Sequence, residues 1–294
     1  MKIRVPASSA NLGAGFDSLG LALGLYNETV IKRSSYLSVS VKGEGSDKPY
    51  IRKNNTFVNI FYDVYKELTG KRDNFRFDFT NAIPFSRGLG SSSSVIVGAI
   101  ASAYYMSDHS VDKEQILNYA LKIESHPDNI TPSVYGGFVT CALDNGKVAM
   151  IKKELSKEIC AVVVIPNTAI STEFARGLLP KQYKIADAVF NLSHAALTSA
   201  AFMSENWEML KIASADRFHE EIRMSKLPKL FEVRRIALES GALMSTLSGS
   251  GSSFLNLVYK KHAKKLLSVL QAEFSEFKVI ELELDNSGFV ITQS

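Results

Sequence analysis

Two segments of the chain alternate between apolar and polar residues. Because successive side chains of a strand point to opposite faces, this period of two predicts a half-buried strand in each segment. The continuous apolar run 159–165 predicts a strand covered on both faces, and 135–143, 254–259 and 278–284 predict three more strands. The alternating residues are Val39, Val41, Phe75, Phe77 and Phe79.

Other segments carry the spacing of helices. Ile60, Val64 and Leu68 recur every four residues and predict a helix over 59–69. Residues 88–106 open with glycine and serine and continue as an apolar helix, and Asp144-Asn145-Gly146 predicts a turn. Further helical segments are expected at 111–124, through most of 185–224, at 229–240 and at 262–274.

Strands and helices are thus mixed along 294 residues without an internal repeat. This length suggests two domains or one large domain. A slight shift in composition near residue 152 favours two domains, 1–152 and 153–294.

Composition narrows the class of protein. Apolar residues make up 46% and charged residues 22%, as in ordinary globular chains, and a net charge of +4 is too small for a nucleic-acid footprint. In the longest uncharged run the apolar part, 95–106, is too short to span a bilayer. We therefore expect a cytoplasmic protein with no membrane or nucleic-acid partner, in which Cys141 and Cys160 are buried thiols.

A glycine- and serine-rich loop precedes the helix expected at 95–106. Its glycines would let the backbone approach a ligand, and a helix N-terminus offers free N–H groups to an anion such as phosphate. The alternative is a flexible turn with an ordinary N-capped helix. No lysine follows the glycines, so the P-loop pattern is absent. The loop consists of Pro84, Phe85, Ser86, Arg87, Gly88, Leu89, Gly90, Ser91, Ser92, Ser93 and Ser94.

Two more segments of small residues, 5–17 and 246–254, have the composition of loops that face a ligand. Together with the loop at 84–94 they resemble the GHMP kinase superfamily, and most closely its homoserine kinase family. The family patterns met here in order are V-P-A-[ST]-S-A-N-L-G-x-G-F-D at 5–17, P-x-x-x-G-L-G-S-S at 84–92, H-x-D-N-x-x-P-x-x-x-G-G at 126–137, T-x-x-x-R-x-x-L-P at 172–180, H-E-x-x-R at 219–223, and a glycine turn at 248–251. Departures at Ala14, Ser93, Ser94, Ser252 and Ser253 are all small-residue changes.

The resemblance implies an α+β, two-domain GHMP kinase fold. Its N-terminal domain would be like domain 2 of ribosomal protein S5, with a left-handed β-α-β crossover, and its C-terminal domain would be ferredoxin-like. ATP would bind along the loop at 84–94, and L-homoserine would be phosphorylated on its hydroxyl, as in threonine biosynthesis, between the domains. A homodimer is left open.

The resemblance also assigns residues. It places Mg²⁺ on Glu124 and Ser92, and the catalytic group at Asn129, Asp128 and Glu124. Asn129 stands where mevalonate kinases carry an aspartate, and an amide cannot accept the proton. We therefore expect no side chain with a pKa near neutrality to control the chemical step, and Asp128 and His126 are equally well explained as loop scaffolding.

The acceptor-binding residues implied by the family are spread over the whole chain. Asp17 would hold the ammonium group, and Arg176 and Arg223 would hold the carboxylate as bidentate forks. Arg87, although inside the loop, is expected to extend its head into solvent. The full acceptor set is Asn11, Asp17, His126, Asn129, Thr172, Arg176, Arg223 and Gly249. The alternatives are a GHMP kinase for another small alcohol, such as mevalonate, and a non-catalytic sensor that binds ATP.

Overall fold

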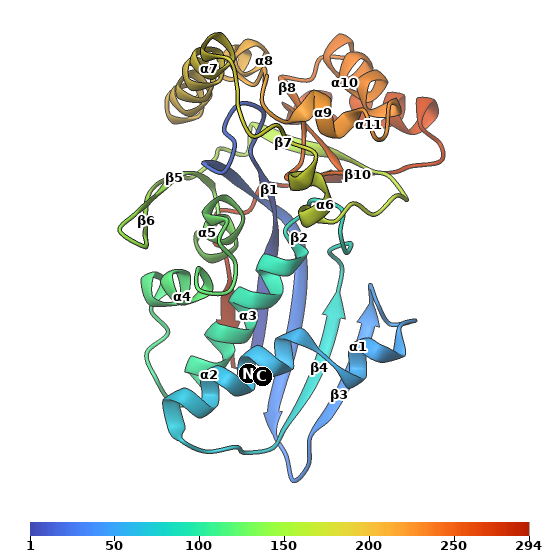
Figure 1. Cartoon of the computed structure of the whole chain (residues 1–294). Helices are drawn as coiled ribbons and strands as arrows, with labels where there is room; N and C mark the ends of the chain where they lie inside the picture. The colour runs from blue at the N-terminus through green and yellow to red at the C-terminus, as the bar shows by residue number, and fades with distance from the viewer. Residues whose placement is uncertain (294) are drawn as a thin grey trace.

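The computed structural model describes residues 1–293, and its first half is built on a seven-stranded sheet (Figure 1). The main path runs β11-β1-β2-β4-β3, and β5 pairs with both β2 and β6. β3 and β4 are parallel and are joined through α1 and α2, which gives the expected β-α-β unit; its handedness stays a prediction. The strands are β1 (Lys2–Ala10), β2 (Leu19–Arg33), β3 (Ser38–Gly43), β4 (Phe75–Asn81), β5 (Phe138–Asp144), β6 (Lys147–Lys153) and β11 (Val290–Thr292).

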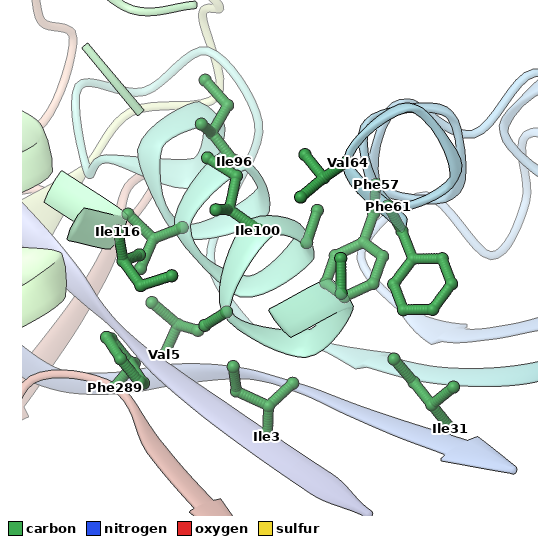
Figure 2. Packing of buried hydrophobic residues seen from close by; sticks show 14 of the residues in the cluster. Ile3, Val5, Ile31, Phe57, Phe61, Val64, Ile96, Ile100, Ile116 and Phe289 are labelled. Carbon is green, nitrogen blue, oxygen red and sulfur yellow. The ribbon is translucent and has the colours of Figure 1, made fainter. Parts of the chain in front are cut away.

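Helices cover one face of this sheet. Phe57 and Phe61 of α2 pack edge-to-face on the strand residues Phe77 and Phe75, and Ile100 of α3 completes the same core (Figure 2). The alternating phenylalanines of β4 therefore face the helices, as their spacing predicts. The helices of this half are α1 (Pro49–Lys53), α2 (Thr56–Thr69), α3 (Ser91–Met106), α4 (Lys113–Ala120) and α5 (Pro127–Tyr135).

The second half contains an antiparallel sheet in the order β10-β7-β9-β8. Counted along the chain this is 4-1-3-2, with helices in the first and last connections, so the expected ferredoxin-like arrangement is confirmed. The elements are β7 (Ile159–Ile165), α6 (Thr172–Gly177), α7 (Ile185–Ser204), η1 (Trp207–Met209), α8 (Leu210–Ala213), α9 (Glu220–Met224), α10 (Lys229–Glu239), β8 (Met244–Leu247), β9 (Phe254–Tyr259), η2 (Lys260–His262), α11 (Ala263–Glu273) and β10 (Lys278–Leu282).

A continuous apolar core joins the two halves. Leu21 and Leu23 of β2 share one cluster with Val163 of β7 and Leu255 of β9. The last strand, β11, returns from the second half and pairs with β1. The division into 1–152 and 153–294 stays a prediction, and residue 294 lies outside the described part of the chain.

Most expected elements are confirmed, with two corrections. The segment 5–17 does not form a loop throughout, because its first half is buried in β1, where small side chains fit beneath the packed helices. Residues 127–135 form α5, although Pro127 and Pro132 suggest a break; a proline at the first helical position leaves no N–H unsatisfied. Cys141 and Cys160 are buried free thiols, as expected. Among residues 1–293 no helix is long and apolar enough to cross a membrane.

Candidate active site

The site is a cavity of about 180 Å³ between the two halves. It lies where the N-terminus of α3 meets the β1–β2 connection, the N-terminus of α5, helix α6, helix α9 and the β8–β9 turn. These elements come from far-apart parts of the sequence. Every expected site residue lines this cavity except Phe85 and Ser94.

Glycines shape the loop before α3, but for a different reason from the one expected. Gly88 and Gly90 both have positive φ, +72° and +67°. A Cβ on Gly88 would lie 2.0 Å from the Ser248 carbonyl oxygen, and one on Gly90 would lie 2.0 Å from the Ser8 hydroxyl. The glycines thus make room for the neighbouring protein chain as well as for any ligand, so a larger side chain at Gly90 would have to displace Ser8.

This packing gives a prediction about stability. Gly88→Ala should destabilise the fold by about 1–3 kcal/mol more than Gly146→Ala, since overpacking adds to the cost of a left-handed alanine. Gly146 is the matched control because its φ is +77° and nothing lies within 4 Å of a Cβ there. Urea unfolding of the two variants measures the difference; equal losses would contradict the packing argument.

Arg87 ties the loop to the second half of the molecule. Its Nε donates to the Pro166 carbonyl (2.9 Å) and its Nη2 to the Asn167 carbonyl (2.6 Å). The expectation of a solvated head group is therefore wrong, because the β7–α6 connection passes close enough to accept both bonds. The Ser248 hydroxyl adds a bond to the Gly88 carbonyl (2.6 Å). The loop before α3 is thus hydrogen-bonded to the β7–α6 connection and to the β8–β9 turn.

Two residues of the segment 84–94 face elsewhere, and the segment is not a loop throughout, because α3 begins at Ser91. The Ser94 hydroxyl is buried, accepts from Asn27 Nδ2 (2.9 Å) and donates to the Ser91 carbonyl, so we do not retain Ser94 in the nucleotide site. Phe85 instead lines a second cavity of about 330 Å³ on the other side of Ser91 and Ser92. No local pattern in the sequence indicates this cavity, because its walls come from separate elements. Its lining includes Tyr50, Asn54, Phe57, Phe79 and Asn81.

Opposite charges meet on the acceptor side of the first cavity. Both carboxylate oxygens of Asp17 accept from Arg176, at 2.8 and 3.1 Å. Asn11 holds the turn that carries Asp17: its Oδ1 accepts from the Asp17 N–H (3.1 Å), and its Nδ2 donates to the Gly249 carbonyl (3.0 Å). The residues expected to bind an ammonium and a carboxylate therefore lie side by side and neutralise each other.

Asp128 lies at the start of α5 and is only 1% exposed. Burial, reinforced by the nearby Asp17 charge, raises the pKa of Asp128 to about 7. A carboxyl group with a pKa near neutrality is thus present in the site; the expectation that no such group controls the chemical step stays a prediction. The neighbouring His126 contacts Glu124 through Nδ1, and this hydrogen bond raises the pKa of His126.

Arg223 is buried and held by a neutral histidine. The His219 Nε2 donates to the Gly13 carbonyl (2.9 Å), and its Nδ1 accepts from Arg223 Nη1 (3.1 Å). Burial lowers the pKa of His219 to about 4, so the ring is free to accept this bond at neutral pH. Asp216 accepts from the His219 and Glu220 N–H groups (both 2.8 Å) and so fixes the start of α9. The sequence did not suggest this support for Arg223.

Three buried polar atoms in residues that line this cavity have no hydrogen-bond partner among residues 1–293. They are Asp128 Oδ2, Arg176 Nε and Arg223 Nε. An unpaired buried donor or acceptor lowers the stability of the fold by about 1–3 kcal/mol, so such groups are usually hydrogen-bonded. The lining of this one cavity therefore includes a carboxyl group and two guanidinium groups that each keep an unpaired polar atom.

Comparison with known proteins gives the family of this chain. Residues 55–137 match the GHMP kinases N terminal domain, and residues 195–276 match the GHMP kinases C terminal domain. A homoserine kinase of Campylobacter jejuni (strain 81-176) is 58% identical over 291 residues, which cover 99% of this chain and 100% of that protein. The chain belongs to the homoserine kinase family.

Other members of this family are similar over the same length. A homoserine kinase of a Nitratiruptor species is 54% identical over 293 residues and covers 100% of both chains. The crystal structure of homoserine kinase from Cytophaga hutchinsonii has a TM-score of 0.88 at 24% identity and covers 99% of this chain and 97% of that chain. A mevalonate kinase structure has a TM-score of 0.72 at 15% identity, covering 98% of this chain and 100% of that one, so the two share the fold.

Proposed function

We propose that the cavity between the two halves binds L-homoserine, and that the enzyme transfers the γ-phosphoryl group of ATP to its hydroxyl. The observation that carries this proposal is the grouping of Asp17, Asp128, Arg176 and Arg223 around one small cavity. Membership of the homoserine kinase family supports the same reaction. The product, O-phospho-L-homoserine, would be used in the synthesis of threonine.

The charges of the site suggest how the acceptor is held. The homoserine ammonium would bind Asp128 Oδ2 and Asp17, and its carboxylate would bind Arg223 and Arg176. Asp17 and Arg176 would exchange their mutual ion pair for these contacts with the substrate. Charged hydrogen bonds contribute about 1.5–3 kcal/mol each. Asn129 and Asn11 would orient the hydroxyl. An amide cannot take the proton, but a loose transition state needs positioning more than deprotonation.

The nucleotide would lie along the loop 84–93. The first N–H groups of α3 have no partner within the helix and would donate to the phosphates. The second cavity adjoins Ser91 and Ser92 and is lined by Tyr50, Phe57 and Phe79, which offer aromatic surface to the adenine base. The oxygen of the acceptor would form the new P–O bond as the bond to the ADP oxygen breaks.

The residues present fit a magnesium ion that arrives with the nucleotide. Glu124 and Ser92 line the same cavity. In the described part of the chain no group of three or more His, Cys, Asp or Glu side chains could hold an ion by itself. One carboxylate and one hydroxyl leave room for phosphate and water oxygens, the ligands Mg²⁺ prefers. When bound, the ion would offset the negative charge of the phosphates.

Glu124→Gln should therefore lower turnover at ordinary Mg²⁺ concentrations and recover part of it at high Mg²⁺. The amide keeps the shape of the side chain but loses the charge that attracts the cation. A Mg²⁺ titration of the initial rate measures the effect, with the exposed Glu154→Gln as control. An unchanged dependence of the rate on Mg²⁺ concentration would mean that a residue other than Glu124 binds the ion.

The reaction itself is tested by ADP release from the purified enzyme with different alcohols. We expect ADP release with L-homoserine far above that with mevalonate or with no acceptor. Faster turnover with mevalonate would favour the isoprenoid alternative. ATP binding without turnover of any alcohol would favour the sensor.

A further inference from the structure

The ring of Phe16 contacts both arginines of the acceptor side. Phe16 is half-buried in the β1–β2 connection, and the guanidinium carbon Cζ of Arg176 lies 5.3 Å from its ring centroid. The Cζ of Arg223 lies 5.4 Å from the same centroid. A cation within about 6 Å of an aromatic centroid is attracted by the electron density of the ring. One side chain therefore joins two cations that come from different helices, α6 and α9.

Phe16 is itself held in place on two sides. The His219 ring packs against it, with the two ring centroids 5.2 Å apart. The backbone beside it forms a tight turn, in which the Gly15 carbonyl accepts from the Ser18 N–H (3.0 Å) and the Leu19 N–H (2.9 Å). The position of the ring is thus fixed before a substrate arrives.

The two guanidinium groups repel each other. Burial, and after it the positive charge of Arg176, lowers the pKa of Arg223 to about 10. Asp17 accepts from Arg176 in this structure, but in the proposed complex its carboxylate also binds the substrate ammonium. The contacts of the two arginines with Phe16 need no such exchange, so they can hold both cations before and after the substrate binds.

An aromatic face holds a guanidinium group without using its N–H donors. Arg176 Nε and Arg223 Nε are buried and have no hydrogen-bond partner within residues 1–293. A carbonyl or carboxylate group in place of the ring would accept from such donors and compete with the substrate carboxylate. Phe16 lies outside the lining of the cavity, so its ring does not compete with the substrate for space.

We propose that Phe16 is a positioning residue for the acceptor carboxylate: its ring keeps the guanidinium groups of Arg176 and Arg223 at a fixed spacing with their N–H donors free. This role rests on the proposed function, because it requires an acceptor whose carboxylate binds both arginines. It belongs to the aromatic face and not to the bulk of the side chain, so kinetics can separate it from a purely structural role.

Steady-state kinetics of Phe16→Leu tests this role. Leucine keeps an apolar side chain but has no aromatic face, so KM for homoserine should rise about tenfold while kcat and KM for ATP stay nearly unchanged. With 3-aminopropan-1-ol, which lacks the carboxylate, kcat/KM of the variant should equal that of the wild type. Phe277→Leu is the matched control and should keep wild-type kinetics, because Phe277 is also half-buried, has Lys229 Nζ 5.9 Å from its ring centroid and lies outside the cavity lining.

Fluorinated phenylalanines at position 16 test the electrostatic part with little change of shape. Each fluorine withdraws electron density from the ring face, so KM for homoserine should rise stepwise from phenylalanine to its monofluoro, trifluoro and pentafluoro forms. A constant KM through this series, or an equal loss of kcat/KM with 3-aminopropan-1-ol in Phe16→Leu, would overturn the positioning role and leave the proposed function standing. A wild type that does not phosphorylate homoserine would overturn the proposed function, and the role of Phe16 with it.

Discussion

Arg223→Leu is expected to lower kcat/KM for homoserine by about a hundredfold, mainly by raising KM, and to leave KM for ATP nearly unchanged. Arg223 is 4% exposed and is already oriented by His219 and the Gly249 carbonyl, so its fork is fixed before the substrate arrives. Losing a charged hydrogen bond costs about 1.5–3 kcal/mol, and about 1.4 kcal/mol corresponds to a factor of ten. Removing a buried cation also leaves the substrate carboxylate partly unpaired.

Steady-state kinetics with each substrate varied in turn measures this effect. Arg223→Lys keeps the charge but loses the planar fork, and so it should fall between wild type and leucine. Arg235→Leu is the matched control, since Arg235 lies on the surface in a pair with Glu239. If KM for homoserine and KM for ATP rise together, Arg223 either keeps the two halves of the molecule in place or binds the nucleotide. If neither moves, other groups bind the acceptor.

Asp128→Asn is expected to remove the acid limb of the pH profile of kcat/KM for homoserine. The pKa of Asp128 is raised to about 7, chiefly by burial, so in wild type the carboxylate that would bind the ammonium is lost as pH falls through about 7. Because the proposed role is in binding, the limb should appear in KM, and kcat should stay nearly flat. A limb in kcat would instead make Asp128 a proton acceptor.

The same substitution should increase stability above neutral pH. The Asp128 carboxyl binds its proton more tightly in the folded protein than in the unfolded chain. The free energy of unfolding of the wild type therefore falls as pH rises from about 4 to about 7. A shift of about three pKa units corresponds to at most about 4 kcal/mol, which Asp128→Asn would recover at pH 8 but not at pH 4. Urea unfolding at the two pH values checks the difference. A variant that is less stable at pH 8 would contradict the buried, raised carboxyl.

Features that are contiguous in the sequence were the ones that could be predicted from it. The glycine turn before α3 and the apolar strand at 159–165 can each be predicted from a few consecutive residues. The strand lies where it is expected, whereas α3 begins at Ser91 and not at residue 95. The first strand was missed because Ser8 and Ser9 look like loop residues until the helices above β1 require small side chains.

Features that depend on distant partners could not be predicted. Asp17 and Arg176 are 159 residues apart, and only the folded chain shows that each is the other's partner. Arg87 resembles a solvated loop arginine until the carbonyls of Pro166 and Asn167 are brought beside it. The raised pKa of Asp128 likewise comes from burial, which no local pattern encodes.

Recognition of a zwitterion by paired charges is tested most directly by removing one charge of the substrate at a time. The measurement is kcat/KM of the wild-type enzyme for L-homoserine, for 4-hydroxybutanoate, which lacks the ammonium, and for 3-aminopropan-1-ol, which lacks the carboxylate. Each analogue should lose about a hundredfold or more, since each leaves buried charges without a partner. Comparable values for homoserine and either analogue would show that the corresponding charge is not recognised.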